Sequence, residues 1–256
     1  MSPSVSARVL HPPVDPAPHR IAVPWRRSPD EAGPAESPDP VANVATDPHW
    51  SADEVFERAL HSGNPLHLVH WDGPRVELDV NRWLAPPDTV DHSVLDRCEG
   101  PVLDVGCGPG RMLLALQHRR VEAAGVDVTP GAVRLATTNG ATVWCQSVYE
   151  SLPVKRRWRT ILLLDGNIGI SGHPSRLLSR LWDLLGPGGQ AIVEIATEDI
   201  DAMVPVSLSH EGRSSRPFIW AYQGLSAVER RAAAIGYQLR EHWALGGRQF
   251  VSLSRN

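Results

Sequence analysis

A glycine-rich segment in the middle of the chain carries the residues best suited to binding a small molecule. Residues 102–111 read Val-Leu-Asp-Val-Gly-Cys-Gly-Pro-Gly-Arg, so a short apolar run leads into three glycines at alternate positions. Glycine lets the backbone adopt positive φ and approach a ligand without a Cβ in the way. A helix that begins at Arg111 would add free N–H groups at the same place. The pattern predicts a ligand crevice at the carboxyl end of a buried strand.

Two acidic residues near this turn indicate which ligand it takes. Asp104 stands two positions before the first glycine, and Asp127 ends the next apolar run. A carboxylate at Asp104 is awkward beside a pyrophosphate but suits an ammonium group or an ordered water. An acid at the position of Asp127 can accept both hydroxyls of a ribose. The spacing G-x-G-x-G also differs from the dinucleotide fingerprint G-x-G-x-x-G. Together these features favour S-adenosylmethionine over NAD.

The elements that must position these residues follow from the apolar pattern after Pro101. Short apolar runs alternate with helical segments, which is typical of parallel strands buried on both faces. The expected strands are 102–105, 123–128, 142–146, 160–164 and 190–196, and the expected helices are 111–118, 131–138, 175–185 and 226–235. A final hairpin, 237–243 with 248–253, turns at Gly246-Gly247, so the sheet ends with an antiparallel pair.

The chain divides into two parts, a tail and a domain that includes this sheet. Residues 1–47 are rich in proline, which removes backbone donors and disfavours helix, so we expect a disordered tail. A domain over 48–256 follows. It opens with a capping box at Ser51, a helix that stops at Gly63, an extended pair around Asp72-Gly73 and a helix over 88–98. Two further strands, 202–209 and 216–222, form an inserted hairpin.

Composition limits the possible functions. The 256-residue chain has 25 Lys plus Arg and 29 Asp plus Glu, a formal net charge of −4, which provides no positive field for nucleic acid. No apolar stretch approaches the ~20 residues that cross a bilayer, and no signal pattern is present. Three cysteines without metal-ligand spacing exclude a disulfide scaffold and a zinc finger. We expect a cytoplasmic, reduced protein without a metal, a nucleic-acid partner or a membrane partner.

The motifs above resemble those of class I S-adenosylmethionine-dependent methyltransferases. Residues 102–111 look like the first motif of that family, Gly125–Asp127 like its second, and Leu184–Gly189 like the turn before its fifth strand. The resemblance covers about residues 88–256. It implies an α/β, Rossmann-like seven-stranded sheet with an antiparallel last strand and helices on both faces. A small N-terminal helical cap and the inserted hairpin, residues 48–90 and 200–222, would cover the substrate.

The same resemblance implies the roles of individual residues. The three glycines would lie along the methionine moiety of the cofactor, and Asp127 would bind its ribose. Ser147 would replace the carboxylate that often binds adenine. The full set of cofactor-binding candidates is Asp104, Gly106, Cys107, Gly108, Gly110, Asp127, Val128, Ser147, Val148 and Asp165. Asp165, Asn167 and His173 follow the fourth strand, where the family places residues that face the methyl group, and are the catalytic candidates. For Asp165 the alternative is a helix-capping role near Ser175.

The chemistry we expect is transfer of a methyl group to a small-molecule acceptor by in-line displacement. Aligning the donor and acceptor supplies most of the catalysis. A base is needed only where the acceptor must lose a proton; further candidates are His49, His70, His210 and Glu211. Trp50, Trp71, Trp83 and Trp220 would either wall a flat acceptor or pack the cap onto the sheet. Two other functions stay open: a non-catalytic S-adenosylmethionine-binding module, and an NAD-dependent oxidoreductase.

Overall fold

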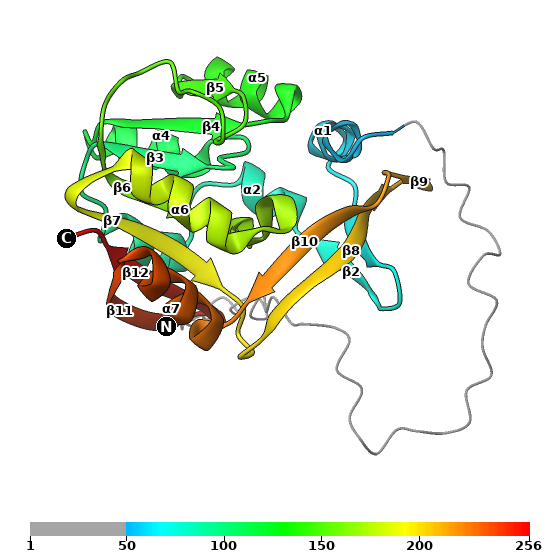
Figure 1. The fold of residues 1–256 in the computed structure, drawn as a ribbon. Helices are drawn as coiled ribbons and strands as arrows, with labels where there is room; N and C mark the ends of the chain where they lie inside the picture. The colour runs from blue at the N-terminus through cyan, green and yellow to red at the C-terminus, as the bar shows by residue number, and fades with distance from the viewer. Residues whose placement is uncertain (1–49) are drawn as a thin grey trace, which may run out of the picture.

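The computed structural model describes residues 50–256; the expected tail of residues 1–47 and His49 lie outside them. Its central sheet has seven strands in the order β11-β12-β7-β6-β3-β4-β5 (Figure 1). These strands are β3 (Val102–Val105), β4 (Ala123–Asp127), β5 (Val143–Cys145), β6 (Trp158–Leu163), β7 (Leu185–Ile195), β11 (Gln238–Leu245) and β12 (Arg248–Ser254). Strands β3 to β7 pair in parallel, whereas β12 runs antiparallel to β7 and β11 antiparallel to β12. The expected sheet and its antiparallel end are confirmed.

Helices cover both faces of this sheet because its central strands, such as β3 and β6, are apolar and buried on both sides. On one face α6 (Pro174–Leu184) and α7 (Leu225–Ile235) pack through residues such as Leu177 and Val228. On the other face α3 (Thr89–Leu95) and α4 (Arg111–His118) pack through residues such as Leu95 and Leu116. Helix α5 (Pro130–Thr138) lies beside α4, where Ala136 joins a small cluster with Leu113. The expected two-faced arrangement is therefore confirmed.

The expected cap differs from the structure, which forms a second antiparallel sheet, here called the cap sheet. Its strands are β1 (Leu66–His70), β2 (Arg75–Leu78), β8 (Asp201–His210), β9 (Arg213–Ser214) and β10 (Phe218–Gln223), in the order β10-β8-β1-β2 with β9 beside β8. Leu68 pairs with Leu208, so the hairpin near the N-terminus and the one inserted after β7 share a ladder. Each hairpin alone would leave a strand edge unpaired, and pairing removes both edges.

Two helices complete the cap. Helix α1 (Ala52–Ser62) has the expected capping box at Ser51 and ends at Gly63, which adopts the left-handed conformation. Helix α2 (Val80–Leu84), which the sequence did not lead us to expect, is capped by Asp79. The apolar side of α1 packs on the inner face of the cap sheet. Figure 1 shows the cap sheet projecting from the end of β7 toward α1.

A short 3-10 helix, η1 (Asn167–Gly172), links β6 to α6 and packs against strand β10 of the cap sheet. Strand β10 lies so close to it that a Cβ on Gly169 would come within 2.5 Å of both the Ala221 carbonyl oxygen and the Trp220 ring. The end of β10 is also tied to β7, because the Ala196 N–H donates to the Gln223 carbonyl over 2.9 Å. The cap sheet is therefore fixed to the carboxyl ends of the central strands.

Candidate active site

A cavity of about 480 Å³ lies between the carboxyl ends of the central strands and the cap sheet. This is the place where open α/β sheets bind ligands, because strand-to-helix turns leave free backbone groups there. Most of the residues that the sequence analysis singled out line it: Gly106, Cys107, Gly108, Asp127, Val128, Ser147, Val148, Asp165 and Asn167.

Three of the expected site residues do not line the cavity. Asp104 is buried within β3, behind the glycine turn. Gly110 caps the start of α4 in the left-handed conformation and faces Ala136, 3.0 Å from where a Cβ would stand. His173 is exposed at the start of α6. His173 is thus the one catalytic candidate that does not line the cavity.

The glycine turn is shaped to leave room for a ligand. Gly106 and Gly108 have φ of 72° and 53°, values that L side chains rarely adopt. A Cβ on Gly106 would lie 2.4 Å from Asn167 Nδ2, whereas a Cβ on Gly108 would meet nothing within 4 Å. The first glycine thus admits Asn167, and the second faces open space.

Asp127 lies beside that open space at the end of β4. Its Oδ2 accepts a hydrogen bond from the Gly108 N–H, and its Oδ1 accepts one from the Thr129 N–H, both over 2.8 Å. Burial raises the pKa of Asp127, and these backbone donors oppose the rise. Asp53 of α1 also lines the cavity; its pKa is raised by burial and then by the charge of Asp127. Two carboxylates therefore flank this part of the cavity.

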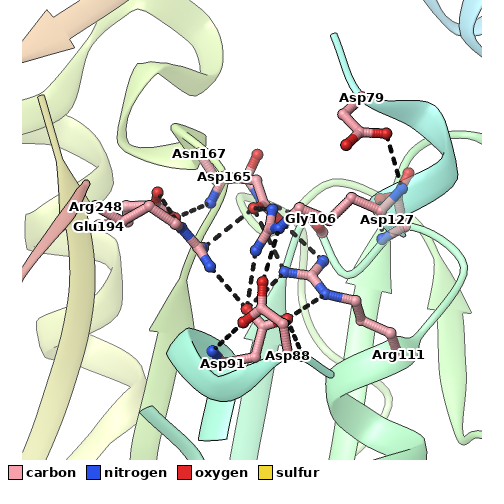
Figure 2. Close-up of polar contacts among 12 residues, drawn as sticks. Asp79, Asp88, Asp91, Gly106, Arg111, Asp127, Asp165, Asn167, Glu194 and Arg248 are labelled. Carbon is pink, nitrogen blue, oxygen red and sulfur yellow. Dashed lines mark hydrogen bonds and ion pairs between the residues drawn. The ribbon is translucent and has the colours of Figure 1, made fainter. Parts of the chain in front are cut away.

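Three arginines and three acids form a largely buried ion network along one side of the cavity (Figure 2). Arg111 Nε lies 3.0 Å from Asp91 Oδ2, and Arg82 Nη1 lies 2.6 Å from Asp165 Oδ1. The six side chains, from α2, α3, α4, the end of β6, β7 and β12, are Arg82, Arg111, Arg248, Asp91, Asp165 and Glu194. Their formal charges cancel, so the three guanidinium groups that line the cavity are already paired.

The network changes the roles expected for Asp165 and Asn167. Burial acts to raise the pKa of Asp165, but the guanidinium groups led by Arg111 outweigh it and hold that pKa below its ordinary value. The Asn167 amide donates to the Val105 carbonyl over 3.0 Å and to the Gly106 carbonyl over 2.9 Å. Asp165 is thus a paired anion and Asn167 a brace for the glycine turn. The geometry provides no general base at either residue.

Asp104 has no such ion pair among the described residues. Its side chain is 4% exposed and makes no hydrogen bond within residues 50–256. Burial raises its pKa to about 7; Arg111 opposes the rise, and the charges of Asp165 and Asp127 add to it. A carboxyl group of this kind behind the glycine turn is stabilised in its ionised form by a cation bound at that turn.

Aromatic side chains wall the part of the cavity that faces the cap. Phe56 and Trp83 lie with ring centroids 5.4 Å apart, and Phe218 and Trp220 lie 6.2 Å apart on β10. All four line the cavity. Trp71 is 72% exposed. Trp50 lies outside the cavity, against the guanidinium groups of Arg58 and Arg213. Two of the four tryptophans considered from sequence are therefore wall residues.

Several lining residues were not found from sequence. Phe218 and Tyr222 stand two positions before and two positions after Trp220 on β10, so the period of a strand could have placed them on the same face as that tryptophan. Phe56 and Asp53 lie on α1, and nothing in their spacing distinguishes them from other positions of an amphipathic helix. Tyr149, which follows the cavity residues Ser147 and Val148, does not line the cavity; its hydroxyl lies 2.9 Å from Ser171 Oγ.

Comparison with known proteins identifies the central part of the chain. Residues 102–189 match the family model described as a methyltransferase domain. The ubiquinone biosynthesis O-methyltransferase of Psychrobacter cryohalolentis is 24% identical over 152 residues, 56% of this chain and 57% of that protein. The trans-aconitate 2-methyltransferase of Deinococcus radiodurans is 29% identical over 113 residues, 43% of each chain. The chain thus spans about half the length of these curated relatives.

Solved structures match a larger part of the chain at lower identity. A SAM-dependent methyltransferase from Bacteroides fragilis, in complex with S-adenosyl-L-homocysteine, has a TM-score of 0.67 and 20% identity, over 79% of this chain and 93% of that one. The CcbJ methyltransferase of Streptomyces caelestis has a TM-score of 0.51 and 17% identity, over 68% and 91%. At these identities the likeness concerns the fold. Among residues 50–256, no helix is both long and apolar enough to cross a membrane.

Proposed function

We propose that this chain, whose residues 102–189 form a methyltransferase domain on the Rossmann-like fold of class I S-adenosylmethionine-dependent methyltransferases, transfers a methyl group from S-adenosylmethionine to a small-molecule acceptor. The functional unit is residues 48–256, with the cap over the acceptor. One observation carries the proposal: the open space beside Gly108 is bordered by Asp127, which stands at the end of the neighbouring strand.

The residues of the glycine turn fit this cofactor. Asp127 holds the ribose hydroxyls through the lone pairs that its two backbone hydrogen bonds leave over. The backbone at Gly106–Gly108 passes the methionine part, and buried Asp104 favours the positive charge of that part. Ser147 and Val148 border the adenine. When bound, S-adenosylmethionine supplies a methyl group on a sulfonium, which an acceptor displaces in line.

The cap supports a small acceptor. The cavity is closed over by the cap sheet, and its outer part is walled by aromatic rings, which suit a flat or apolar molecule. Because the lining arginines are all paired within the ion network, no phosphate backbone is needed to neutralise them. The three free cysteines, Cys98, Cys107 and Cys145, are consistent with a reducing compartment such as the cytoplasm.

Calorimetric titration with S-adenosylhomocysteine tests this function. We expect micromolar affinity, about −8 kcal/mol, and no affinity for NAD. Asp127→Ala removes hydrogen bonds to a charged group, each worth ~1.5–3 kcal/mol, so the affinity should fall ~100-fold or more. Asp199→Ala is the matched control, since Asp199 also accepts a backbone N–H, that of Ser226, but lies outside the cavity. It should bind as the wild type does.

Two results would count against the proposal. A folded wild-type chain that fails to bind S-adenosylhomocysteine would remove the cofactor assignment. Binding without turnover, over a broad set of acceptors, would favour a non-catalytic binding module instead.

A further inference from the structure

The inner face of the cap sheet is mostly apolar, and within it His70 and Tyr222 form a polar pair. His70 ends β1 and Tyr222 lies near the end of β10, 152 residues later in the chain. The His70 Nε2 is 2.8 Å from the Tyr222 hydroxyl oxygen, and the two rings stack with centroids 5.8 Å apart. Tyr222 lines the cavity, while His70 lies behind it, 5% exposed. Neither residue has a part in the cofactor site described above.

The hydrogen bonds of His70 fix the direction in which a proton can move. Its Nδ1 is 2.9 Å from the Pro74 carbonyl oxygen. A carbonyl only accepts, so Nδ1 carries the proton of the neutral ring and Nε2 carries the lone pair. The Tyr222 hydroxyl must therefore donate to Nε2. Its own oxygen then has lone pairs to accept a hydrogen bond from a donor in the cavity.

Tyr222 lines the same cavity as the glycine turn and is connected to that turn through η1. Ala221, the residue before Tyr222, has its carbonyl oxygen against Gly169 of η1. Asn167 of the same 3-10 helix donates to the Gly106 carbonyl of the glycine turn over 2.9 Å. The 3-10 helix η1 thus contacts both the strand that carries Tyr222 and the glycine turn of the proposed cofactor site. Trp220, on the same strand, also lines the cavity.

We propose that Tyr222 and His70 form a proton relay for an acceptor that carries a hydroxyl group on a flat, apolar scaffold. This inference rests on the proposed methyltransferase function. The acceptor hydroxyl gives its proton to the Tyr222 oxygen, and the Tyr222 proton passes to His70 Nε2. The electron pair left on the acceptor oxygen forms the bond to the methyl carbon, and the carbon–sulfur bond breaks with its pair returning to sulfur. The positive charge of the sulfonium is thereby replaced by that of the His70 imidazolium.

The chemistry of the pair selects this acceptor class. Burial raises the pKa of Tyr222, so the tyrosine stays protonated and can take a proton only by passing its own to His70. A neutral amine attacks through a lone pair it already has, and has less need of a base. A carboxylate acceptor has no proton to give and would need a cation, but Arg82, Arg111 and Arg248 are paired with acids. A hydroxyl group is the acceptor that the relay serves.

The first test uses binding alone, with the full chain saturated with S-adenosylhomocysteine and 4-nitrophenol as the probe. This phenol is nearly as acidic as an imidazolium, and its ionised form absorbs visible light. At a pH below the pKa of the free phenol, we expect a larger ionised fraction for the bound probe than for the free probe. Tyr222→Phe keeps the ring and removes the relay, so that extra ionised fraction should disappear. An unchanged fraction in Tyr222→Phe would overturn the relay.

The second test follows turnover with S-adenosylmethionine and two phenols. General-base catalysis contributes about 10²–10⁴-fold, so Tyr222→Phe and His70→Gln should each lower kcat for phenol at least ~100-fold, and less for the more acidic 4-nitrophenol. The KM for S-adenosylmethionine should not change. Glutamine at position 70 can still hydrogen-bond but cannot take a proton, so an active His70→Gln variant would contradict the role of His70.

Two matched variants separate the relay from general destabilisation. Tyr237→Phe also removes a buried tyrosine hydroxyl, one that donates to the Leu178 carbonyl over 3.0 Å outside the cavity. His210→Gln alters a histidine of the cap sheet whose Nδ1 similarly faces a carbonyl, that of Pro65, over 3.1 Å. Both should leave kcat for phenol unchanged.

The titration with S-adenosylhomocysteine, repeated on every variant, distinguishes the two proposals. A wild-type chain that binds S-adenosylhomocysteine but neither binds nor methylates the phenols overturns the acceptor class and leaves the methyltransferase function standing. A wild-type chain that does not bind S-adenosylhomocysteine overturns the function itself.

Discussion

Two neighbouring acids of the site have pKa values shifted in opposite directions, because the charged groups around them differ. Asp104 is buried within β3, and Asp165, whose side chain is 18% exposed, lies just after β6 at the same end of the central sheet. The guanidinium groups of Arg111, Arg82 and Arg248 overcome the burial of Asp165 and keep its pKa low. Asp104 has no hydrogen bond within the described part of the chain, and burial raises its pKa to about 7. Charge partners, and not residue type, therefore decide which acid can respond to a bound cation.

Asp104→Asn should stabilise the free protein at high pH. The folded-state pKa of about 7 lies above the ordinary aspartate value of 3.8, so the folded protein holds the Asp104 proton more tightly than the unfolded chain does. This contribution to the free energy of unfolding is fully present below pH 3.8 and is lost as the pH rises through 7. Asparagine does not titrate. Each pKa unit corresponds to ~1.4 kcal/mol, so the advantage of the variant should grow to roughly 4 kcal/mol above pH 7. Urea unfolding at a series of pH values measures this difference.

The exposed Asp96, which pairs with Arg119, provides the control for that series. Asp96→Asn should show no comparable gain with pH. If the difference in free energy of unfolding between Asp104→Asn and the wild type did not change with pH, Asp104 would ionise in the folded protein without cost, and the raised pKa would be wrong. The Asp104→Asn variant should also bind S-adenosylhomocysteine more weakly than the wild type, because the carboxylate behind the glycine turn is gone.

Among the secondary-structure elements, β10 of the cap and η1 of the central domain make a particularly tight contact. Strand β10 lies on η1 at Gly169, whose built Cβ would be 2.5 Å from the Ala221 carbonyl oxygen. Since a backbone atom blocks the space, a side chain there must push the strand away. This contact sets the height of the aromatic wall and of Tyr222 above the cofactor site.

Gly169→Ala should therefore separate acceptor binding from cofactor binding. Overpacking of this kind costs ~1–3 kcal/mol of stability, and the displaced β10 should weaken the binding of 4-nitrophenol at least ~10-fold. The affinity for S-adenosylhomocysteine should stay within a factor of about two, because that site belongs to the central sheet. Paired titrations of the two ligands give the comparison.

Gly186→Ala is the control for this variant, since a Cβ there would meet Arg157 Cβ at 3.3 Å, far from the cavity lining. It should change neither affinity. If Gly169→Ala bound 4-nitrophenol like the wild type, the cap would not be held by this contact.

At the scale of the whole molecule, the ion network joins the cap to both ends of the central domain. Arg82 belongs to the cap, Asp91 to α3 and Arg248 to the last strand, and all meet at the turn after β6. Arg248 alone approaches Glu194 at 2.6 Å and Asp91 at 2.8 Å. Such buried groups are stable only together, because a single unpaired charge keeps its full desolvation cost.

Arg248→Met should consequently destabilise the whole fold. Removing one partner of a buried ion pair typically costs ~3–5 kcal/mol, since the remaining acids lose their counter-charge. Arg119→Met, which breaks a largely exposed pair with Asp96, should cost less than ~1 kcal/mol. Urea unfolding of both variants at neutral pH tests the difference, and equal losses would show that the network is no more important than a surface pair.

The central domain could be predicted from local features of the sequence. Apolar runs and glycines are local signals, so the strands, the positive-φ turn at Gly106 and Gly108, the acid at Asp127 and the hairpin at Gly246 could all be predicted from it. The helix and extended pair of the cap were also correct as separate pieces. Each of these features depends on backbone propensity within a few residues, which is why spacing alone was sufficient.

The assembly of the site depends on contacts between residues far apart in the sequence. The pairing of β1 with β8 and the contact of His70 with Tyr222 join residues that lie more than a hundred positions apart, and no local period encodes such a partner. The same holds for Asp165: its place after β6 was readable, but the three arginines that neutralise it come from α2, α4 and β12. A side chain's chemistry depends on its neighbours in space, and the packing of the whole chain selects those neighbours.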